Sequence, residues 1–101
     1  MSVTSKVLFR GAATTNTATV LYTTPANTQA IVTNIVVSNT TATEKTFSLF
    51  LDGVAVNLAA PIAGNSSAYI DLKQVLEATD AITGGVSATG VNFHISGVEL
   101  A

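Results

Sequence analysis

The sequence contains no cysteine and few charged residues. Of its 101 residues, 4 are Lys or Arg and 6 are Asp or Glu, so 10% of the chain is charged, whereas about a quarter of a typical soluble domain is charged. The lack of cysteine excludes disulfides, thiolate chemistry and zinc–thiolate sites. The low charge requires that serine, threonine and asparagine, or another protein, cover much of the surface.

Basic clusters and long apolar runs are also missing. The fixed cations are Lys6, Arg10, Lys45 and Lys73, and they are scattered along the chain. Nucleic-acid binding and attachment to anionic lipid both need clustered basic side chains. No run of residues approaches the 18 or more apolar residues of a membrane span, and the first residues lack an apolar signal-peptide segment. We therefore expect neither nucleic acid nor membrane as a partner.

Short stretches in which apolar and polar residues alternate dominate the chain. This period of two is typical of β-strands that bury one face, and such strands form antiparallel rather than parallel sheets. The sequence predicts an all-β fold, an antiparallel β-sandwich of the jelly-roll or Ig-like kind with about eight short strands. The expected strands are 6–10, 18–23, 28–39, 46–51, 54–58, 67–72, 81–83 with 86–88, and 91–100.

Several local signals refine this prediction. Asp52-Gly53 separates two alternating runs and predicts a tight hairpin, because both residues of a type I′ turn need positive φ. Gln74 to Glu77 is compatible with one helical turn. Gly97 predicts a bulge or a kink that returns Val98 and Leu100 to the apolar face.

The alternation also yields a core and a domain boundary. No linker interrupts the chain, so residues 7–101 are expected to form one domain, and residues 1–6, which have no apolar partners of their own, are expected to form an N-terminal arm. The predicted core comprises Leu8, Val20, Tyr22, Ile31, Ile35, Val37, Phe47, Leu49, Leu51, Val54, Val56, Ile70, Leu72, Leu76, Ile82, Val91, Phe93 and Ile95.

Residues able to perform chemistry are rare. His94 is the only histidine, and a triad with Asp71 and Ser67 would lack a nucleophile elbow and a fixed partner for the imidazole. The triplets Asn39-Thr40-Thr41 and Asn65-Ser66-Ser67 match the N-glycosylation pattern, but without a signal peptide they are interpreted as ordinary polar loop residues. The sequence predicts a protein without catalytic activity, cofactor or metal site.

Side chains on the outer faces of the predicted strands are candidates for contact with other proteins. Phe50 lies on the polar side of its strand, where a loop or a neighbouring protein must cover it. Together with Phe50, the candidate interface residues are Val3, Lys6 and His94. A surface with little charge suits close packing against other subunits.

Three stretches carry a resemblance to a known group of proteins: LYTTPANTQAIVTNIVVSNTTATEKTFSLFLDGVAV (21–56), APIAGNSSAYIDLKQVLEATDAI (60–82) and GVNFHISGVEL (90–100). Their order of proline turn, LDG hairpin, Pro-Ile turn and terminal V-N-x-H-I-S-G-V-E resembles small β-sandwich structural proteins of tailed-bacteriophage virions. The resemblance extends over residues 7–100 and carries no catalytic residues.

The resemblance implies a virion protein, with a head decoration (cement) protein favoured. Such a protein binds the major capsid protein on the head surface and associates with copies of itself, with a trimer favoured. The alternative is a tail, baseplate or fibre module, which could bind carbohydrate or a receptor.

Overall fold

The computed structural model describes residues 2–101, which form eight β-strands in two antiparallel sheets of four. The predicted all-β sandwich is confirmed. The strands are β1 (Val3–Ala12), β2 (Val20–Thr23), β3 (Gln29–Asn39), β4 (Lys45–Leu51), β5 (Val54–Ile62), β6 (Ser66–Leu76), β7 (Ala81–Val86) and β8 (Val91–Leu100).

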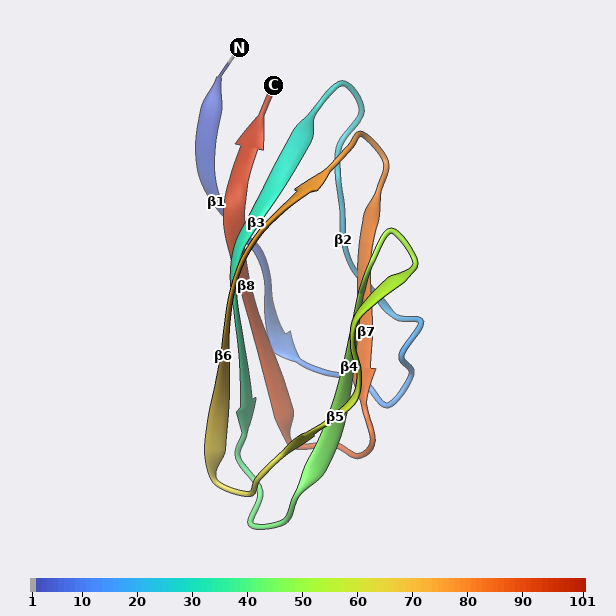
Figure 1. Cartoon of the computed structure of the whole chain (residues 1–101), viewed down its shortest axis with the longest axis vertical. Helices are drawn as coiled ribbons and strands as arrows, with labels where there is room; N and C mark the ends of the chain where they lie inside the picture. Colours follow the sequence, from blue (N-terminus) through green and yellow to red (C-terminus); the bar gives the residue numbers. More distant parts are fainter. Residues whose placement is uncertain (1) are drawn as a thin grey trace.

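The strand order identifies the kind of sandwich. One sheet has the order β1-β8-β3-β6 and the other has the order β2-β7-β4-β5. Strands therefore pair first with last, second with seventh, third with sixth and fourth with fifth, as in a long hairpin rolled over itself, which is the jelly roll. Figure 1 shows the two layers, with both termini at one end of the elongated molecule. The β1-β8-β3-β6 layer is called the first sheet below, and the other layer is called the second sheet.

The Asp52-Gly53 hairpin forms as predicted. Leu51 pairs with Val54, and the two turn residues have φ values of 52° and 76°. Positive φ at both central positions gives the turn the twist that its strands require.

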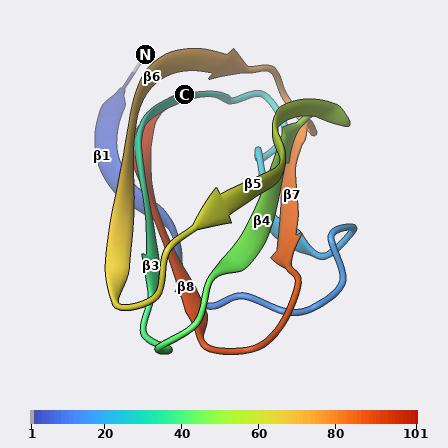
Figure 2. The ribbon, with the colours of Figure 1, turned by 60° about the horizontal axis from the view of Figure 1, so that its bottom comes forward.

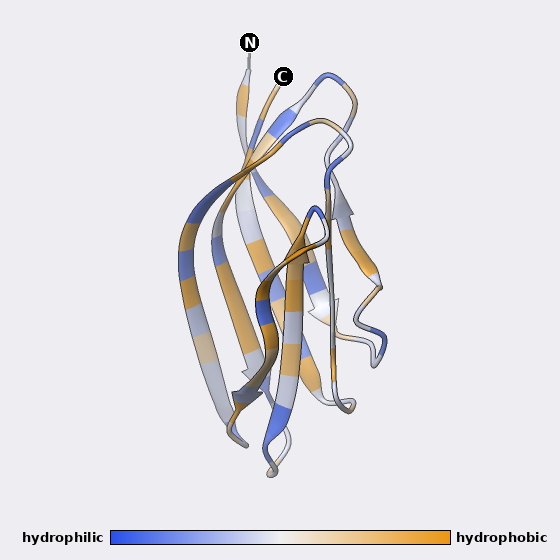
Figure 3. Ribbon diagram, turned by 45° about the vertical axis from the view of Figure 1, so that its right-hand side comes forward, coloured by the Kyte–Doolittle hydropathy of each residue, from blue (hydrophilic) through white to orange (hydrophobic). Residues whose placement is uncertain are grey.

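The core lies between the two sheets and contains most of the predicted residues. Phe47 of the second sheet and Phe93 of the first meet edge to face, with ring centroids 6.5 Å apart, a favourable aromatic geometry. Figure 3 shows the alternation of apolar and polar residues along the strands that supplies this interior. The predicted core residues that are buried are Leu8, Tyr22, Ile35, Val37, Phe47, Leu49, Leu76, Ile82, Val91, Phe93 and Ile95. Leu51, Ile70 and Leu72 are partly buried and pack against them.

A bulge in β3 changes which residues face the core. The sequence pattern placed Ile31 on the same face as Ile35, but the register shifts between Val32 and Asn34. Ala30 and Val32 are therefore buried, and Ile31 is only half-buried. One extra residue in a strand moves every side chain beyond it to the opposite face of the sheet from the face that strict alternation predicts.

Three predicted core residues are exposed. Val54 and Val56 lie on β5, an edge strand that carries two register irregularities. Val20 is exposed because the pairing of β2 shifts between Val20 and Tyr22, which buries Leu21 beside Tyr22. Sequence alternation fails at these places because the strand itself does not alternate regularly.

Two predicted local structures are wrong. Gln74 to Glu77 is not a helical turn, since β6 continues to Leu76 opposite Ala30. Residues 81–83 and 86–88 are expected as two strand pieces separated by Gly84 and Gly85, but β7 runs without interruption from Ala81 to Val86. A Cβ on Gly84 would lie 2.6 Å from the Ser48 carbonyl oxygen, so this glycine permits close strand approach.

The strand β8 is regular through Gly97, so the predicted bulge there is wrong. The irregularities lie on its two neighbours, between Val7 and Phe9 on β1 and between Val32 and Asn34 on β3. Val98 consequently stays on the outer face, and Glu99 takes the inward position expected for an apolar side chain.

The segment expected to form an N-terminal arm continues the sheet. From Val3 to Lys6 the chain pairs with Leu100 to Gly97 on β8, and Ser2 and Ala101 exchange backbone hydrogen bonds. Residue 1 lies outside the described residues. Residues 2–6 are exposed, so this end of β1 forms surface of the sandwich.

Candidate functional surface

Apolar side chains gather on the outer face of the first sheet near the two termini. Register places Ser5, Val98, Ile31 and Val75 in one row across the four strands. Val3 and Leu100 form the next pair toward the termini. We call the residues Val3, Val7, Ile31, Val75, Val98 and Leu100 the terminal apolar surface.

This surface is accessible to a partner. The exposed fractions of Val3, Val7 and Val75 are 66%, 45% and 56%, whereas the other three members are half-buried. Scattered single apolar residues are normal on proteins, but apolar residues from all four strands of one face form a candidate interaction surface.

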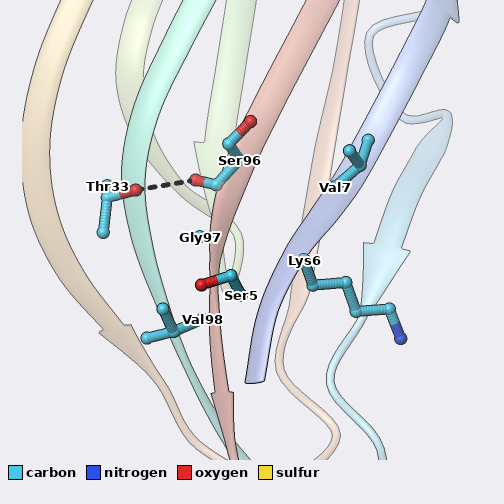
Figure 4. A pocket seen from close by; sticks show the side chains of 7 residues that line it. All are labelled: Ser5, Lys6, Val7, Thr33, Ser96, Gly97 and Val98. Carbon is cyan, nitrogen blue, oxygen red and sulfur yellow. Dashed lines mark hydrogen bonds between the residues drawn. The ribbon is translucent and has the colours of Figure 1, made fainter. Parts of the chain in front are cut away.

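A shallow hollow of about 430 Å³ lies beside these residues. Figure 4 shows Ser5 and Val98 on one side and Thr33 beside Ser96 on the other. Thr33 Oγ1 donates a hydrogen bond to the Ser96 carbonyl oxygen at 3.2 Å, which fixes the bulged residue of β3 against β8. The hollow is thus lined by hydroxyl groups and by two valines, Val7 and Val98.

A polar cluster under this end joins the two sheets. The Tyr22 hydroxyl of the second sheet donates a hydrogen bond to the Glu99 carboxylate of the first, and Lys6 Nζ lies 3.3 Å from the same carboxylate. The Tyr22 hydrogen bond and the Lys6 charge lower the pKa of Glu99. Burial, and then the adjacent carboxylate, raise the pKa of Tyr22. The cluster therefore keeps Glu99 ionised and Tyr22 neutral, and it holds the C-terminal end of β8 against the second sheet.

Removing the charge of Glu99 is expected to change the acid sensitivity of the fold. Because the folded-state pKa lies below the unfolded value, the stabilisation is present above the unfolded pKa of about 4.3 and is lost as pH falls through the folded pKa. Glu99→Gln should lower the free energy of unfolding at neutral pH and should approach the wild type in acid. Urea unfolding at a series of pH values measures both effects.

Glu44→Gln serves as the control for this prediction. Glu44 is exposed and makes no side-chain hydrogen bond or ion pair among residues 2–101. A constant difference between Glu99→Gln and the wild type at every pH would contradict the role assigned to the carboxylate.

Comparisons with known proteins leave the family of the chain open. No protein-family model matches it, and no curated protein matches it.

The four interface residues expected from the sequence do not form one patch. Val3 belongs to the terminal apolar surface. His94 lies on the same outer face between Arg10 and Val36, six residues along β8 from the partner of Val3, or about 20 Å.

The other two lie elsewhere. Lys6 contacts Glu99. Phe50 is on the second sheet opposite Thr83, is half-buried, and lines a hollow together with residues 17 and 18 of the β1–β2 loop.

The three residues of the possible triad do not come together. Asp71 is paired with Asn34 and Ser67 with Ser38, whereas His94 is two strands away from both, on β8. Residues 2–101 contain no group of three His, Cys, Asp or Glu side chains that could hold a metal ion. Within the same range, no helix is long and apolar enough to cross a membrane.

Sequence reasoning missed Val7 and Val75 as surface residues. Val75 lies within the segment that was expected to be a helical turn, so strand alternation was not applied to it and its outward position on β6 was not predicted. Val7 differs from the buried Leu8 by one position, and only the β1 bulge decides which of the two faces outward. If residues 66–76 are treated as one alternating strand, Val75 is predicted to lie on the same outer face as Tyr69.

Proposed function

We propose that this chain is a non-enzymatic structural protein of a tailed-bacteriophage virion, a head decoration protein that binds the outer surface of the capsid shell. The proposed partners are the major capsid protein and further copies of the chain, in a trimer. The terminal apolar surface is the proposed contact with the shell.

The terminal apolar surface is the observation that carries this proposal. Its members come from all four strands of one sheet, so the attachment face is held rigid by the sheet hydrogen bonds. A preordered apolar face loses little conformational entropy when it binds.

Charge and fold add support of a more general kind. With 10% charged residues, the protein can be covered by neighbours at little desolvation cost. Jelly rolls are common in viral capsid proteins, an analogy of fold that does not by itself assign function.

Co-sedimentation with phage heads that lack this protein tests the proposal. The heads come from the phage that encodes the chain, and bound protein is quantified against added protein. Val75→Asp is expected to weaken binding by at least about tenfold, because each 1.4 kcal/mol lost from the contact is a tenfold change and a buried unpaired charge costs more than that.

Val20→Asp is the matched control. Val20 is on the second sheet and its exposed fraction of 57% matches the 56% of Val75, so equal binding by this variant and the wild type is expected. Binding should also persist at high ionic strength, because the contact is apolar rather than ionic. Association with isolated tails instead of heads, or equal losses in both variants, would overturn the proposal.

A further inference from the structure

A second hollow lies at the end of the molecule opposite the termini. Its volume is about 340 Å³, and hydroxyl and amide residues line it without a charged or large apolar side chain. The hollow is formed where β3 ends and β6 begins, with the adjoining connectors, a region that comes forward in Figure 2. The lining residues are Ser38, Asn39, Thr40, Asn65, Ser66 and Ser67.

Asn39 makes the frame of this hollow rigid. Its side chain is buried, and Nδ2 donates hydrogen bonds to the carbonyl oxygens of Thr43, Ile62 and Ala63 at 2.8, 3.1 and 3.2 Å. Oδ1 accepts a hydrogen bond from the Thr41 backbone at 3.0 Å. One amide therefore ties the connector after β3 to the end of β5.

Other polar groups in the hollow remain available to a ligand. Ser38 and Ser67 are direct partners on adjacent strands, and Asn65 is an exposed turn residue with φ of 53°. None of these three side chains makes a hydrogen bond within residues 2–101. Two hydroxyls and one amide thus face solvent from a fixed backbone.

An exposed aromatic ring stands next to these groups. Tyr69 has an exposed fraction of 75%, and its neighbours Ala68 and Ile70 pack against the core, so the ring is on the outer face. It pairs with Val36, two residues along the ladder from the Ser38–Ser67 pair. Side chains two residues apart on a strand lie on the same face, about 7 Å from each other.

We propose that Tyr69 and the polar hollow bind a neutral sugar ring of a glycan. An aromatic ring stacks on the apolar C–H face of a pyranose, while hydroxyl and amide groups exchange hydrogen bonds with its hydroxyls. A sugar ring stacked on Tyr69 reaches the Ser67 and Ser38 hydroxyls, because this pair lies two residues along the ladder from the Tyr69–Val36 pair. The residues that line the hollow carry no charge, so the hollow itself suits a neutral sugar.

The lining chemistry favours a glycan over a protein partner. The centre of a protein interface is apolar and rich in aromatic and methionine side chains, whereas this hollow presents hydroxyl and amide groups. Its position is also independent of the proposed shell contact, since the terminal apolar surface occupies the opposite end of the same sheet. The glycan site can therefore be right or wrong irrespective of the head-decoration function.

A glycan array probed with the intact protein tests the inference, with neutral hexose and N-acetylhexosamine oligosaccharides among its ligands. A neutral oligosaccharide that binds is then titrated into ¹⁵N-labelled protein. We expect shifts at residues 38–40 and 65–69. Tyr69→Ala should raise the dissociation constant by at least about tenfold, and Tyr69→Phe should retain most of the affinity because the ring remains.

Val54→Ala on the second sheet is the control and should leave glycan binding unchanged, because Val54 is exposed at the β4–β5 hairpin, remote from the hollow. Tyr69 is exposed, so its replacement leaves the core intact, and the dispersion of the amide spectrum verifies this. Absence of binding to every neutral oligosaccharide would overturn the inference, as would unchanged affinity of Tyr69→Ala. Loss of head binding in Tyr69→Ala without any glycan binding would assign Tyr69 to a protein interface instead.

Discussion

Phe93→Ala is expected to lower the free energy of unfolding by about 3–5 kcal/mol, the range for truncation of a buried phenylalanine. Phe93 is fully buried and its ring contacts Phe47 across the two sheets. Truncation removes the aromatic pair and leaves a cavity that the paired strands on both sides cannot close. Urea denaturation followed by circular dichroism measures the loss.

Phe50→Ala is the control, because it makes the same change on the outer face of the second sheet. Phe50 is half-buried beside a loop. A loss of about 1 kcal/mol is expected, because its ring buries less apolar area on folding than the ring of Phe93 does. Equal losses in the two variants would contradict the placement of the core between the sheets.

Gly97→Ala is expected to cost about 3 kcal/mol, the upper part of the range for overpacking. A Cβ at this position would overlap the Ile31 carbonyl oxygen and would lie 3.1 Å from Leu8 Cδ1. The obstacle is backbone from the bulged strand β3, which cannot rotate away as a flexible side chain can. The same denaturation measurement applies.

Gly11→Ala provides the matched comparison in the first sheet. A Cβ there would lie 3.6 Å from the Phe9 ring, an ordinary contact, so a change within about 0.5 kcal/mol is expected. A neutral effect of Gly97→Ala would show that β3 and β8 do not approach as closely as described.

The sequence was sufficient to predict features governed by local chemistry. The Asp52-Gly53 turn depends on two residues and formed as expected. The alternation in β8 predicted the burial of Val91, Phe93 and Ile95, because that strand is regular through its whole length.

Features that depend on the pairing of distant strands could not be predicted in this way. The bulge at residue 33 of β3 and the shift in β2 each change the face on which side chains lie, and no local signal marked either one. Gly97 did indicate an irregularity, but the extra residues are on the neighbouring strands. A glycine there is needed because the neighbouring backbone lies close.

The candidate sites show the same division. The triplets Asn39-Thr40-Thr41 and Asn65-Ser66-Ser67 are visible in the sequence, but only the pairing of β3 with β6 places residues 39 and 40 beside residues 65–67 in one hollow. Likewise, the terminal apolar surface combines the first residues of β1 with the last of β8 and β6. Such surfaces follow from register, which sequence periodicity alone does not specify.

Cryo-electron microscopy of the proposed virion decides whether the chain is a head decoration protein. We expect density for the sandwich on the head, with the terminal apolar surface against the shell and Tyr69 facing solvent. A map in which the chain is on the tail, or in which Val3 and Val75 face solvent on the head, would contradict it.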